Sequence, residues 1–319
     1  TLKGYGLTVS ATHDVIIRHI KIRIGDVKAD NELYQSDPLS IGNSTNVIID
    51  HCSLQWAIDM AFRATGEYIT LSNTIFGKSL LQNSPHEKGG HAYIGMINEG
   101  AKKVSFVKNF VGDSTQRSPR ITDADWIDAY NNLLYNCGNG FDLYNYEWMN
   151  RNSKMNVHGN YARKGPSLSN GTPYRMGRGR EYAGGVMCYF EDNYGSGGSE
   201  SLQETATQNS SGPKFKKILT FGETNGSAGT DYDLSNVTLT EWDENPVSYD
   251  NNNKTSPGAT FTYMTYPFPA PRGEVLSGSK SSIMDYALDE NNGMGATKPS
   301  RDLYDTMIMK EAEGGTATK

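Results

Sequence analysis

Two aspartates stand 22 residues apart in the first fifth of the chain, each beside a short apolar segment. Asp37 precedes Pro38 and Leu39, and Asp59 ends the stretch that begins at Gln55. If the chain repeats at this interval, the two carboxylates lie on neighbouring turns of one face, where their oxygens could hold a hard cation such as Ca²⁺. A single aspartate of this kind more often caps a turn, so the pairing is what suggests chemistry.

Basic side chains gather in two segments further along. Residues 86–91 hold two histidines, a glutamate and a lysine, and Arg117 and Arg120 flank a Ser-Pro pair. Guanidinium and ammonium groups bind carboxylates. Together with a cation they can stabilise the charge that develops when a weakly acidic proton is removed beside a carboxylate. Each segment also has a simpler interpretation, the first as a solvated loop and the second as a surface arginine pair.

A recurring pattern sets the architecture that would position these residues. A short apolar run, a polar turn residue and a second apolar run recur, most clearly in 15–22, 47–54, 69–76 and 105–111. Two intervals between the turn residues are 22 and 23, and the others fit that period with loops inserted. A period in the low twenties is one turn of a β-solenoid. The turn residues are His19, His51, Asn73, Asn109, Asn132, Asn160 and Asn193.

Asparagine at the later turn positions predicts two local features. It tolerates the left-handed backbone conformation that a sharp bend requires, and stacked amides on successive turns can hydrogen-bond in a ladder. Asp50 and His51 are expected to hold their turn through side-chain hydrogen bonds. The sequence lacks paired hairpin turns and helical segments between strands, which argues against a sandwich and against an α/β fold.

The pattern predicts one domain over 1–319, with turns clearest in 13–195. Residues 196–319 are expected to form loops and a C-terminal packing segment, because Gly, Ser, Asn and Thr dominate their first part. Within 300–313, apolar residues follow helical spacing and predict a short amphipathic helix.

Composition narrows the classes of function. The chain has 319 residues, 34 of them glycine, and 21% are charged, a mixture that suits short strands and many turns. The net charge of −6 argues against binding a nucleic-acid backbone, and no apolar run is long enough for a transmembrane helix. Three scattered cysteines, Cys52, Cys137 and Cys188, are expected to be small buried hydrophobic residues rather than a disulfide framework.

Taken together, these segments resemble the pectate lyases of polysaccharide lyase family 1. Residues 50–59 are similar to the Asp-His-Cys-Ser-x-x-Trp-x-x-Asp motif of its bacterial members, and the segments 86–89, 117–120 and 159–166 follow in the family's order. The resemblance implies an all-β fold, a right-handed parallel β-helix. It also implies a secreted, extracellular enzyme that cleaves polygalacturonate (pectate) or a related polyuronate by Ca²⁺-assisted β-elimination.

The resemblance also assigns a metal site. Asp37 and Asp59 match calcium ligands, and Gln55, which is neutral where many members have Asp, is taken as a third. The family's Glu after the second aspartate is Met60 here, which removes one metal ligand. We therefore expect calcium to bind weakly, or only together with substrate.

The catalytic roles implied by the resemblance fall on basic residues. Arg117 matches the arginine that removes the proton at C5 of the substrate uronate, and Lys88 matches the lysine that binds the substrate carboxylate. Arg120 and His91 are expected to bind substrate beside them, whereas Thr122 stands where well-known members carry a second substrate arginine. Because free arginine is protonated at neutral pH, such a base implies an alkaline optimum or a strong local perturbation.

Two rival interpretations remain open. A non-catalytic carbohydrate-binding β-helix, such as a degenerate lyase or a phage adhesin, would bind oligosaccharides without forming a double bond, and the missing metal ligand favours it. A hydrolase would need paired carboxylates, for which Asp123, Asp125 and Asp128 are the candidates. The aromatic stretch 144–148 is a candidate sugar platform. We expect a monomer without nucleic-acid or membrane partners, and further turns before the position of Thr1 in related proteins.

Overall fold

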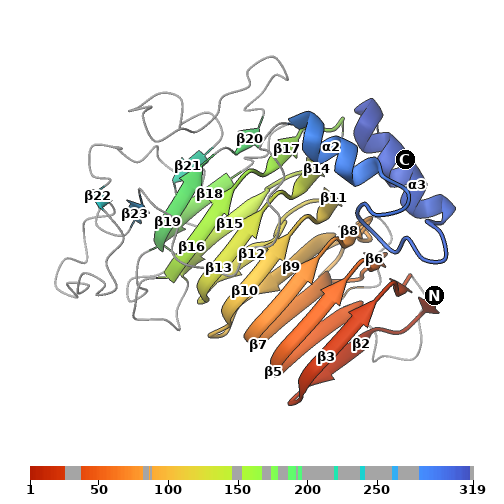
Figure 1. The fold of residues 1–319 in the computed structure, drawn as a ribbon, viewed down its shortest axis with the longest axis horizontal. Coiled ribbons are helices and arrows are strands. Elements are labelled where there is room, and N and C mark those ends of the chain that lie inside the picture. The colour runs from red at the N-terminus through yellow and green to blue at the C-terminus, as the bar shows by residue number, and fades with distance from the viewer. Residues whose placement is uncertain are drawn as a thin grey trace.

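A coil of parallel strands makes up most of the described chain. The computed structural model describes residues 1–25, 37–81, 86, 88–145, 153–166, 174–178, 186–191, 193–195, 219–221, 238–240, 261–264 and 280–316. Within these residues the strands form an 8-stranded and a 15-stranded sheet, and paired strands run parallel. Figure 1 shows them stacked along the long axis of the molecule. The expected all-β fold, a parallel β-helix, is confirmed.

Each turn of the coil contributes one short strand to the eight-stranded sheet. In spatial order these strands are β1 (Leu2–Lys3), β4 (Lys21–Arg23), β6 (Ser53–Gln55), β8 (Ile75–Gly77), β11 (Phe110–Ser114), β14 (Leu133–Cys137), β17 (Tyr161–Arg163) and β20 (Tyr194–Gly195).

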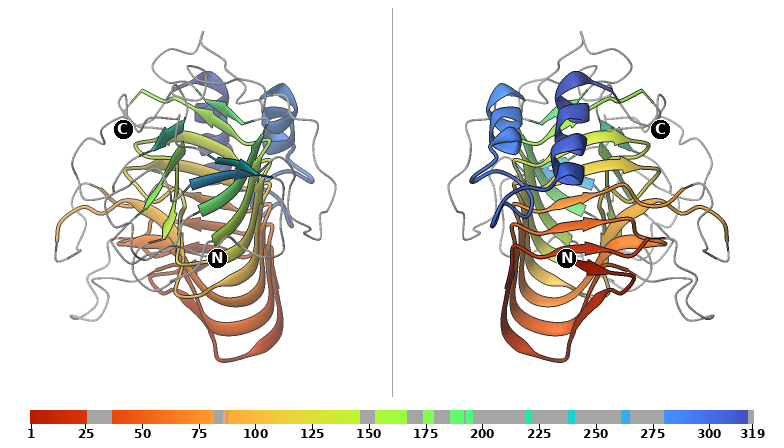
Figure 2. Two further views of the ribbon diagram at one scale, coloured as in Figure 1. Left: turned by 90° about the vertical axis from the view of Figure 1, so that its left-hand side faces the viewer. Right: turned by 90° about the vertical axis from the view of Figure 1, so that its right-hand side faces the viewer.

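The remaining strands form the 15-stranded sheet, and the views along the coil show successive turns lying one behind another (Figure 2). The strands are β2 (Leu7–Ser10), β3 (His13–Arg18), β5 (Leu39–Asp50), β7 (Met60–Ser72), β9 (Tyr93–Ile97), β10 (Lys102–Val107), β12 (Arg120–Thr122), β13 (Asp125–Tyr130), β15 (Phe141–Asn145), β16 (Ser153–His158), β18 (Tyr174–Arg178), β19 (Val186–Glu191), β21 (Leu219–Phe221), β22 (Thr238–Thr240) and β23 (Phe261–Met264).

The left-handed bend and the hydrogen-bonded ladder residue occupy two adjacent positions of the repeat in the later turns, whereas the sequence predicted both for a single position. At the first three turns the left-handed residue is the expected one, with φ of 55° at His19, 50° at His51 and 50° at Asn73. At later turns it is the residue before the asparagine, with φ of 53° at Lys108 and 54° at Asn131. The left-handed conformation expected of the later asparagines is therefore wrong by one residue.

The buried ladder occupies the position after each bend. The backbone N–H of Thr74 donates to Asn109 Oδ1 at 2.9 Å, and that of Asn109 donates to Asn132 Oδ1 at 2.9 Å. The series continues from Asn132 to Asn160 at 3.0 Å and from Asn160 to Asn193 at 3.1 Å. The predicted ladder is confirmed for the four asparagines. On the turn before Asn109 the equivalent position is Thr74, whose Oγ1 accepts from the Cys52 N–H at 3.2 Å.

Asp50 holds its turn as expected. Its carboxylate accepts hydrogen bonds from Ser72 Oγ at 2.8 Å, Asn73 Nδ2 at 2.8 Å and Arg18 Nε at 2.8 Å, and lies 2.9 Å from His51 Nδ1. Burial alone would raise the pKa of Asp50, but the hydrogen bonds from His51, Asn73 and Ser72 outweigh it and hold that pKa well below its ordinary value. The ionised carboxylate is thus a fixed part of this bend.

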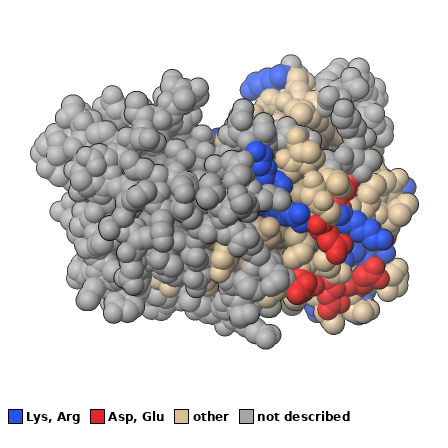
Figure 3. Space-filling view, turned by 90° about the horizontal axis from the view of Figure 1, so that it is seen from above, with Lys and Arg blue, Asp and Glu red and all other residues tan. Residues whose placement is uncertain are grey.

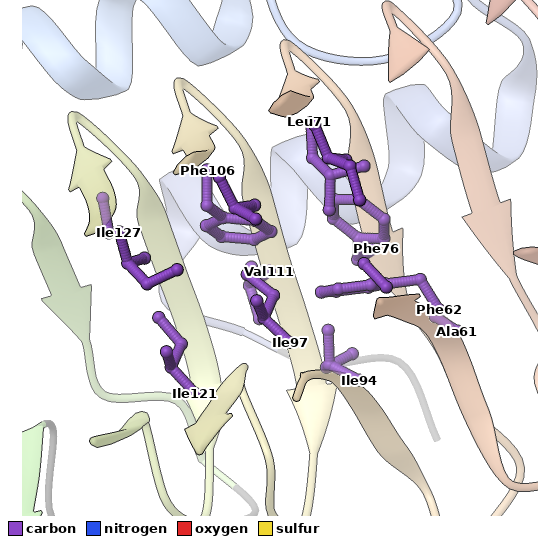
Figure 4. Close-up of a cluster of buried hydrophobic side chains, with 14 of the residues drawn as sticks. Ala61, Phe62, Leu71, Phe76, Ile94, Ile97, Phe106, Val111, Ile121 and Ile127 are labelled. Atoms are coloured by element: carbon purple, nitrogen blue, oxygen red, sulfur yellow. The ribbon is translucent and has the colours of Figure 1, made fainter. Parts of the chain in front are cut away.

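Apolar side chains of successive turns stack inside the coil (Figure 4). The ring of Phe106 stacks on Phe62 and on Phe76, with centroids 5.8 and 5.7 Å apart, and all three side chains are fully buried. Gly95 leaves room for this column, because a Cβ there would lie 2.5 Å from the Phe62 ring. The three cysteines are free, and two of them belong to this core, as expected.

Two helices cover the outer face of the eight-stranded sheet (Figure 1). The expected C-terminal helix is α3 (Leu303–Gly314), capped at its start by the Asp302 side chain. The other, α2 (Lys280–Leu288), was not expected from the sequence. The apolar layer beneath them comprises Ile75, Phe110, Leu133, Tyr135, Ile283, Ala287, Met294, Ile308, Met309 and Ala312. Among the described residues no helix is long and apolar enough to cross a membrane.

Charges of both signs lie next to one another on the described part of the face seen from above (Figure 3). Ion pairs between neighbouring charges also join the C-terminal helix to the coil. Lys78 Nζ lies 3.0 Å from Asp113 Oδ2 in the coil and 2.7 Å from Glu311 Oε2 on α3. These contacts attach the C-terminal helix to the turns beneath it.

Candidate active site

The two predicted metal-binding aspartates lie where neighbouring strands begin. Asp37 precedes β5, and Asp59 directly precedes β7. The strands pair with Leu39 opposite Phe62, a register that sets Asp37 opposite Met60, one residue from Asp59. The Met60 N–H accordingly donates a hydrogen bond to Asp37 Oδ1 at 3.0 Å. The structure therefore brings the two aspartates to the same end of adjacent strands.

Asp37 is held in an environment that disfavours its charge. Burial raises its pKa to about 7, and the negative charge of Asp59 acts in the same direction. The hydrogen bond from Met60 and the positive charges of Arg63 and Arg117 oppose the rise without cancelling it. A cation between the two carboxylates would relieve their mutual repulsion, because opposite charge nearby favours the ionised form.

Arg117 lies beside these aspartates. It follows β11, has a left-handed φ of 55°, and its carbonyl accepts a hydrogen bond from the Gly95 N–H at 2.9 Å. Its Nη1 donates to the sulfur atoms of Met60 at 3.3 Å and Met96 at 3.5 Å. Its Cζ lies 4.4 Å from the centre of the Tyr93 ring. Two thioethers and an aromatic face thus orient the guanidinium group.

Two histidines complete the cluster around Asp59. The rings of His86 and His91 lie with centroids 3.7 Å apart, and His91 makes an edge contact with Tyr93 at 4.8 Å. His86 Nε2 lies 4.0 Å from Asp59 Oδ1. One ligand atom from each of these three residues lies within 4.8 Å of the other two. Nitrogen and oxygen donors therefore converge on one point.

Lys88 lies in the same loop and is exposed. Its backbone N–H donates to His86 Nδ1 at 3.1 Å, which ties the loop to the buried histidine. The neighbouring Glu87 lies outside the described residues. The structure thus brings Lys88 near the histidines, with its side chain open to solvent.

Arg120 follows the predicted base by three residues on the same turn of the coil, at the start of β12. It pairs in register with Met96, the residue whose sulfur contacts Arg117. Its Nη2 lies 3.5 Å from Oδ2 of the fully buried Asp142. Any substrate contact by Arg120 would therefore be made by a guanidinium that is already near a carboxylate.

Gln55 does not join the predicted metal site. It lies in β6 of the eight-stranded sheet, beneath α3, and is 1% exposed. Its Oε1 accepts from Arg23 Nε at 3.1 Å, and its Nε2 donates to Asp305 Oδ1 at 2.9 Å. The left-handed Trp56 (φ 58°) turns the chain between Gln55 and Asp59. The amide that was expected to bind metal is therefore occupied in a buried polar network.

The three carboxylates of the rival hydrolase interpretation are buried. Asp123 occupies a left-handed bend with φ of 50°, and Asp125 Oδ1 accepts from two backbone N–H groups at 3.0 and 3.1 Å. Together with Asp128, they are at most 4% exposed. This burial does not suit a pair that flanks a sugar. The aromatic stretch 144–148 lies outside the residues whose side chains are described.

Two residues around the site, Tyr93 and Met96, were not predicted as site residues, and His86 was named only within the candidate segment 86–91. Tyr93 and Met96 were missed because each acquires its role only through the register between turns. That register sets Met60 opposite Tyr93 and Arg63 opposite Met96. Aligning the turns rather than the motifs would have placed Tyr93 and Met96 at this end of the strands.

Sequence comparison finds pectate lyases among the relatives of this chain. It is 33% identical over 196 residues to a probable pectate lyase C of Aspergillus terreus, covering 61% of this chain and 42% of the relative. The corresponding Aspergillus flavus protein is 31% identical over the same length, with the same coverage. The chain is similar to fungal pectate lyases. It spans less than half the length of these relatives, and no family model matches it.

Structure comparison supports the same fold. The pectate lyase of Paenibacillus sp. 0602 superposes with a TM-score of 0.53, covering 96% of this chain and 74% of that chain. Sequence identity in this comparison is 14%, so the likeness concerns the fold alone.

Proposed function

We propose that this protein is a polysaccharide lyase that cleaves polygalacturonate, or a related polyuronate, by calcium-assisted β-elimination. The observation that carries the proposal is the position of the Arg117 guanidinium, which contacts Met60 beside Asp37 and Asp59 at one end of adjacent strands. The similarity to proteins named probable pectate lyase supports the reaction class.

The donor atoms suit a calcium ion that is only partly held by protein. Ca²⁺ takes six to eight oxygen ligands, and Asp37 and Asp59 offer carboxylate oxygens close together. Met60 offers sulfur, which hard cations do not prefer. Water and the carboxylates of the substrate would supply the remaining ligands. When bound, the ion would withdraw electron density from the uronate carboxylate and so make the neighbouring C5 proton more acidic.

Arg117 is proposed to take that C5 proton, after which the C4–O bond breaks and leaves an unsaturated sugar. Because an ordinary guanidinium stays protonated, the reaction is expected to favour alkaline pH. Exposed Lys88 is proposed to bind a substrate carboxylate, with His91 and Arg120 as further contacts. Gln55 is left out, because its amide is already hydrogen-bonded elsewhere. The protein is proposed to be secreted and to act as a monomeric single domain.

The test is the ultraviolet absorbance of the unsaturated product on polygalacturonate at alkaline pH, with Ca²⁺ and with EDTA. We expect an increase that requires calcium. Arg117→Ala should lower the rate about 10²-fold or more, as expected for loss of a general base. The matched control is Arg18→Ala, an exposed arginine at the N-terminal end of the coil. Full activity in Arg117→Ala would refute the proposed base.

The non-catalytic alternative is a carbohydrate-binding β-helix, favoured by the sulfur of Met60 at the position of a metal ligand. It predicts binding of oligogalacturonates without any increase in absorbance. Binding measured in parallel on the same preparation therefore separates the two functions.

A further inference from the structure

We infer that Asp59, His86 and His91 form a binding site for a borderline divalent cation, with Zn²⁺ as the simplest probe. This site differs in chemistry from the proposed calcium pair, because two of its three ligands are imidazole nitrogens. It stands whether or not the chain is a lyase, since it rests only on the geometry around Asp59.

The three donors are close enough to meet on one ion. Their ligand atoms lie within 4.8 Å of one another, and the pair Asp59 Oδ1 and His86 Nε2 lies at 4.0 Å. Zn²⁺ binds nitrogen and carboxylate oxygen at about 2.0–2.2 Å, so ligands on one ion lie at most about 4 Å apart. A closure of roughly 1 Å by side-chain rotation would complete the site.

Hydrogen bonding prepares His91 as a ligand. Its Nδ1 lies 3.1 Å from the Gly89 carbonyl, which fixes the proton on Nδ1 and leaves the Nε2 lone pair available. A carbonyl in this position is the usual partner of a metal-bound histidine. The structure thus selects the tautomer that metal binding needs.

His86 must change its hydrogen bond to bind metal. Its Nδ1 accepts from the Lys88 N–H at 3.1 Å, so the neutral ring carries its proton on Nε2. Ligation through Nε2 moves that proton to Nδ1 and breaks the bond to Lys88. Occupation of the site therefore reorients the backbone at Lys88, in the loop that carries the proposed substrate-binding lysine.

The ligand set determines which ions fit. Imidazole favours Zn²⁺, Co²⁺, Ni²⁺ and Cu²⁺, whereas Ca²⁺ and Mg²⁺ prefer an all-oxygen shell. Three protein ligands also leave a fourth tetrahedral position open to water or to a ligand. Because Asp59 would serve both sites, Zn²⁺ is expected to compete with calcium there.

The test is isothermal titration of the metal-free full chain with Zn²⁺, without substrate. We expect one ion per chain, with affinity about tenfold or more weaker in His86→Gln and in His91→Gln. The matched control is His13→Gln, an exposed histidine outside the cluster, which should bind as the parent does. Cobalt(II) should give the intense visible absorption of a tetrahedral site, and the two cluster variants should lose it.

Unchanged Zn²⁺ affinity in the double variant His86→Gln/His91→Gln would overturn the inference. So would Ca²⁺ displacing Zn²⁺ at equal concentration. If a histidine variant does not fold, as judged by circular dichroism, Asp59→Asn in the full chain replaces it. Because no substrate is present, failure of the lyase assay leaves this result unaffected, and failure here leaves the lyase proposal unaffected.

Discussion

Replacing Asn132 with alanine would remove three side-chain hydrogen bonds from the middle of the buried ladder. The amide nitrogen donates to the carbonyl of Phe106 at 2.9 Å and to Asn160 Oδ1 at 2.8 Å. The amide oxygen accepts from the Asn109 N–H at 2.9 Å. The side chain is fully buried, so water cannot replace these partners without entering the coil.

The expected loss of unfolding free energy depends on which buried polar groups lose a hydrogen-bond partner. Asn160 Oδ1 keeps the hydrogen bond from the Asn132 backbone N–H at 3.0 Å. The Asn109 N–H and the Phe106 carbonyl each lose their bond to the ladder. An unsatisfied buried polar group costs about 1–3 kcal/mol, so we expect the free energy of unfolding to fall by about 2–6 kcal/mol.

Denaturant unfolding followed by circular dichroism measures this difference. Asn291→Ala is the matched control, because that asparagine is exposed near the end of α2 and should change stability by less than about 0.5 kcal/mol. A loss below about 1 kcal/mol in Asn132→Ala would refute the ladder as a stabilising element.

Three further outcomes are expected. Phe106→Ala should cost about 3–5 kcal/mol in denaturant unfolding, because it removes the central ring of the aromatic column. Asp50→Asn should lower the thermal midpoint at neutral pH. Since the folded pKa of Asp50 is depressed, its stabilisation is complete above about pH 5, decreases progressively below about pH 4 and is lost only as pH falls through the low folded pKa. The difference between parent and variant should therefore shrink steadily as the pH is lowered from about 4. Met60→Glu should raise calcium affinity in the absence of substrate about tenfold by isothermal titration, and an unchanged affinity would count against the proposed calcium pair.

The repeat was predictable because a solenoid places similar side chains at similar points of every turn. The position of the bend within the repeat was not. His51 and Lys108 both adopt the left-handed conformation, although one carries an aromatic ring and the other a long flexible side chain. The ladder requires a side chain that can hydrogen-bond across turns, whereas the bend tolerates many residue types. Turn positions chosen for their asparagines therefore identified the ladder rather than the bend.

Gln55 shows where the family resemblance misleads. It stands four positions before Asp59, where many family members have an aspartate, and it was therefore taken as a third metal ligand. The bend at Trp56 instead sends the two residues to different sheets. The helix α2 was missed for a related reason, since Ile283 and Ala287 gain their apolar partners only from the distant sheet beneath them. In both cases the deciding contacts are tertiary.

Met60 affects both the proposed calcium site and the proposed base, Arg117. A carboxylate at this position would lie against the Arg117 guanidinium and stabilise its charged form, because opposite charges at short range favour ionisation. The thioether present instead is a weak acceptor, so it orients the guanidinium while stabilising its charge less. The same exchange removes an oxygen donor from the proposed calcium site. In the proposed mechanism, Met60 in place of a carboxylate therefore stabilises the charged guanidinium less and leaves the calcium ion with fewer protein ligands. The carboxylates of the substrate are then the proposed source of the missing oxygen ligands.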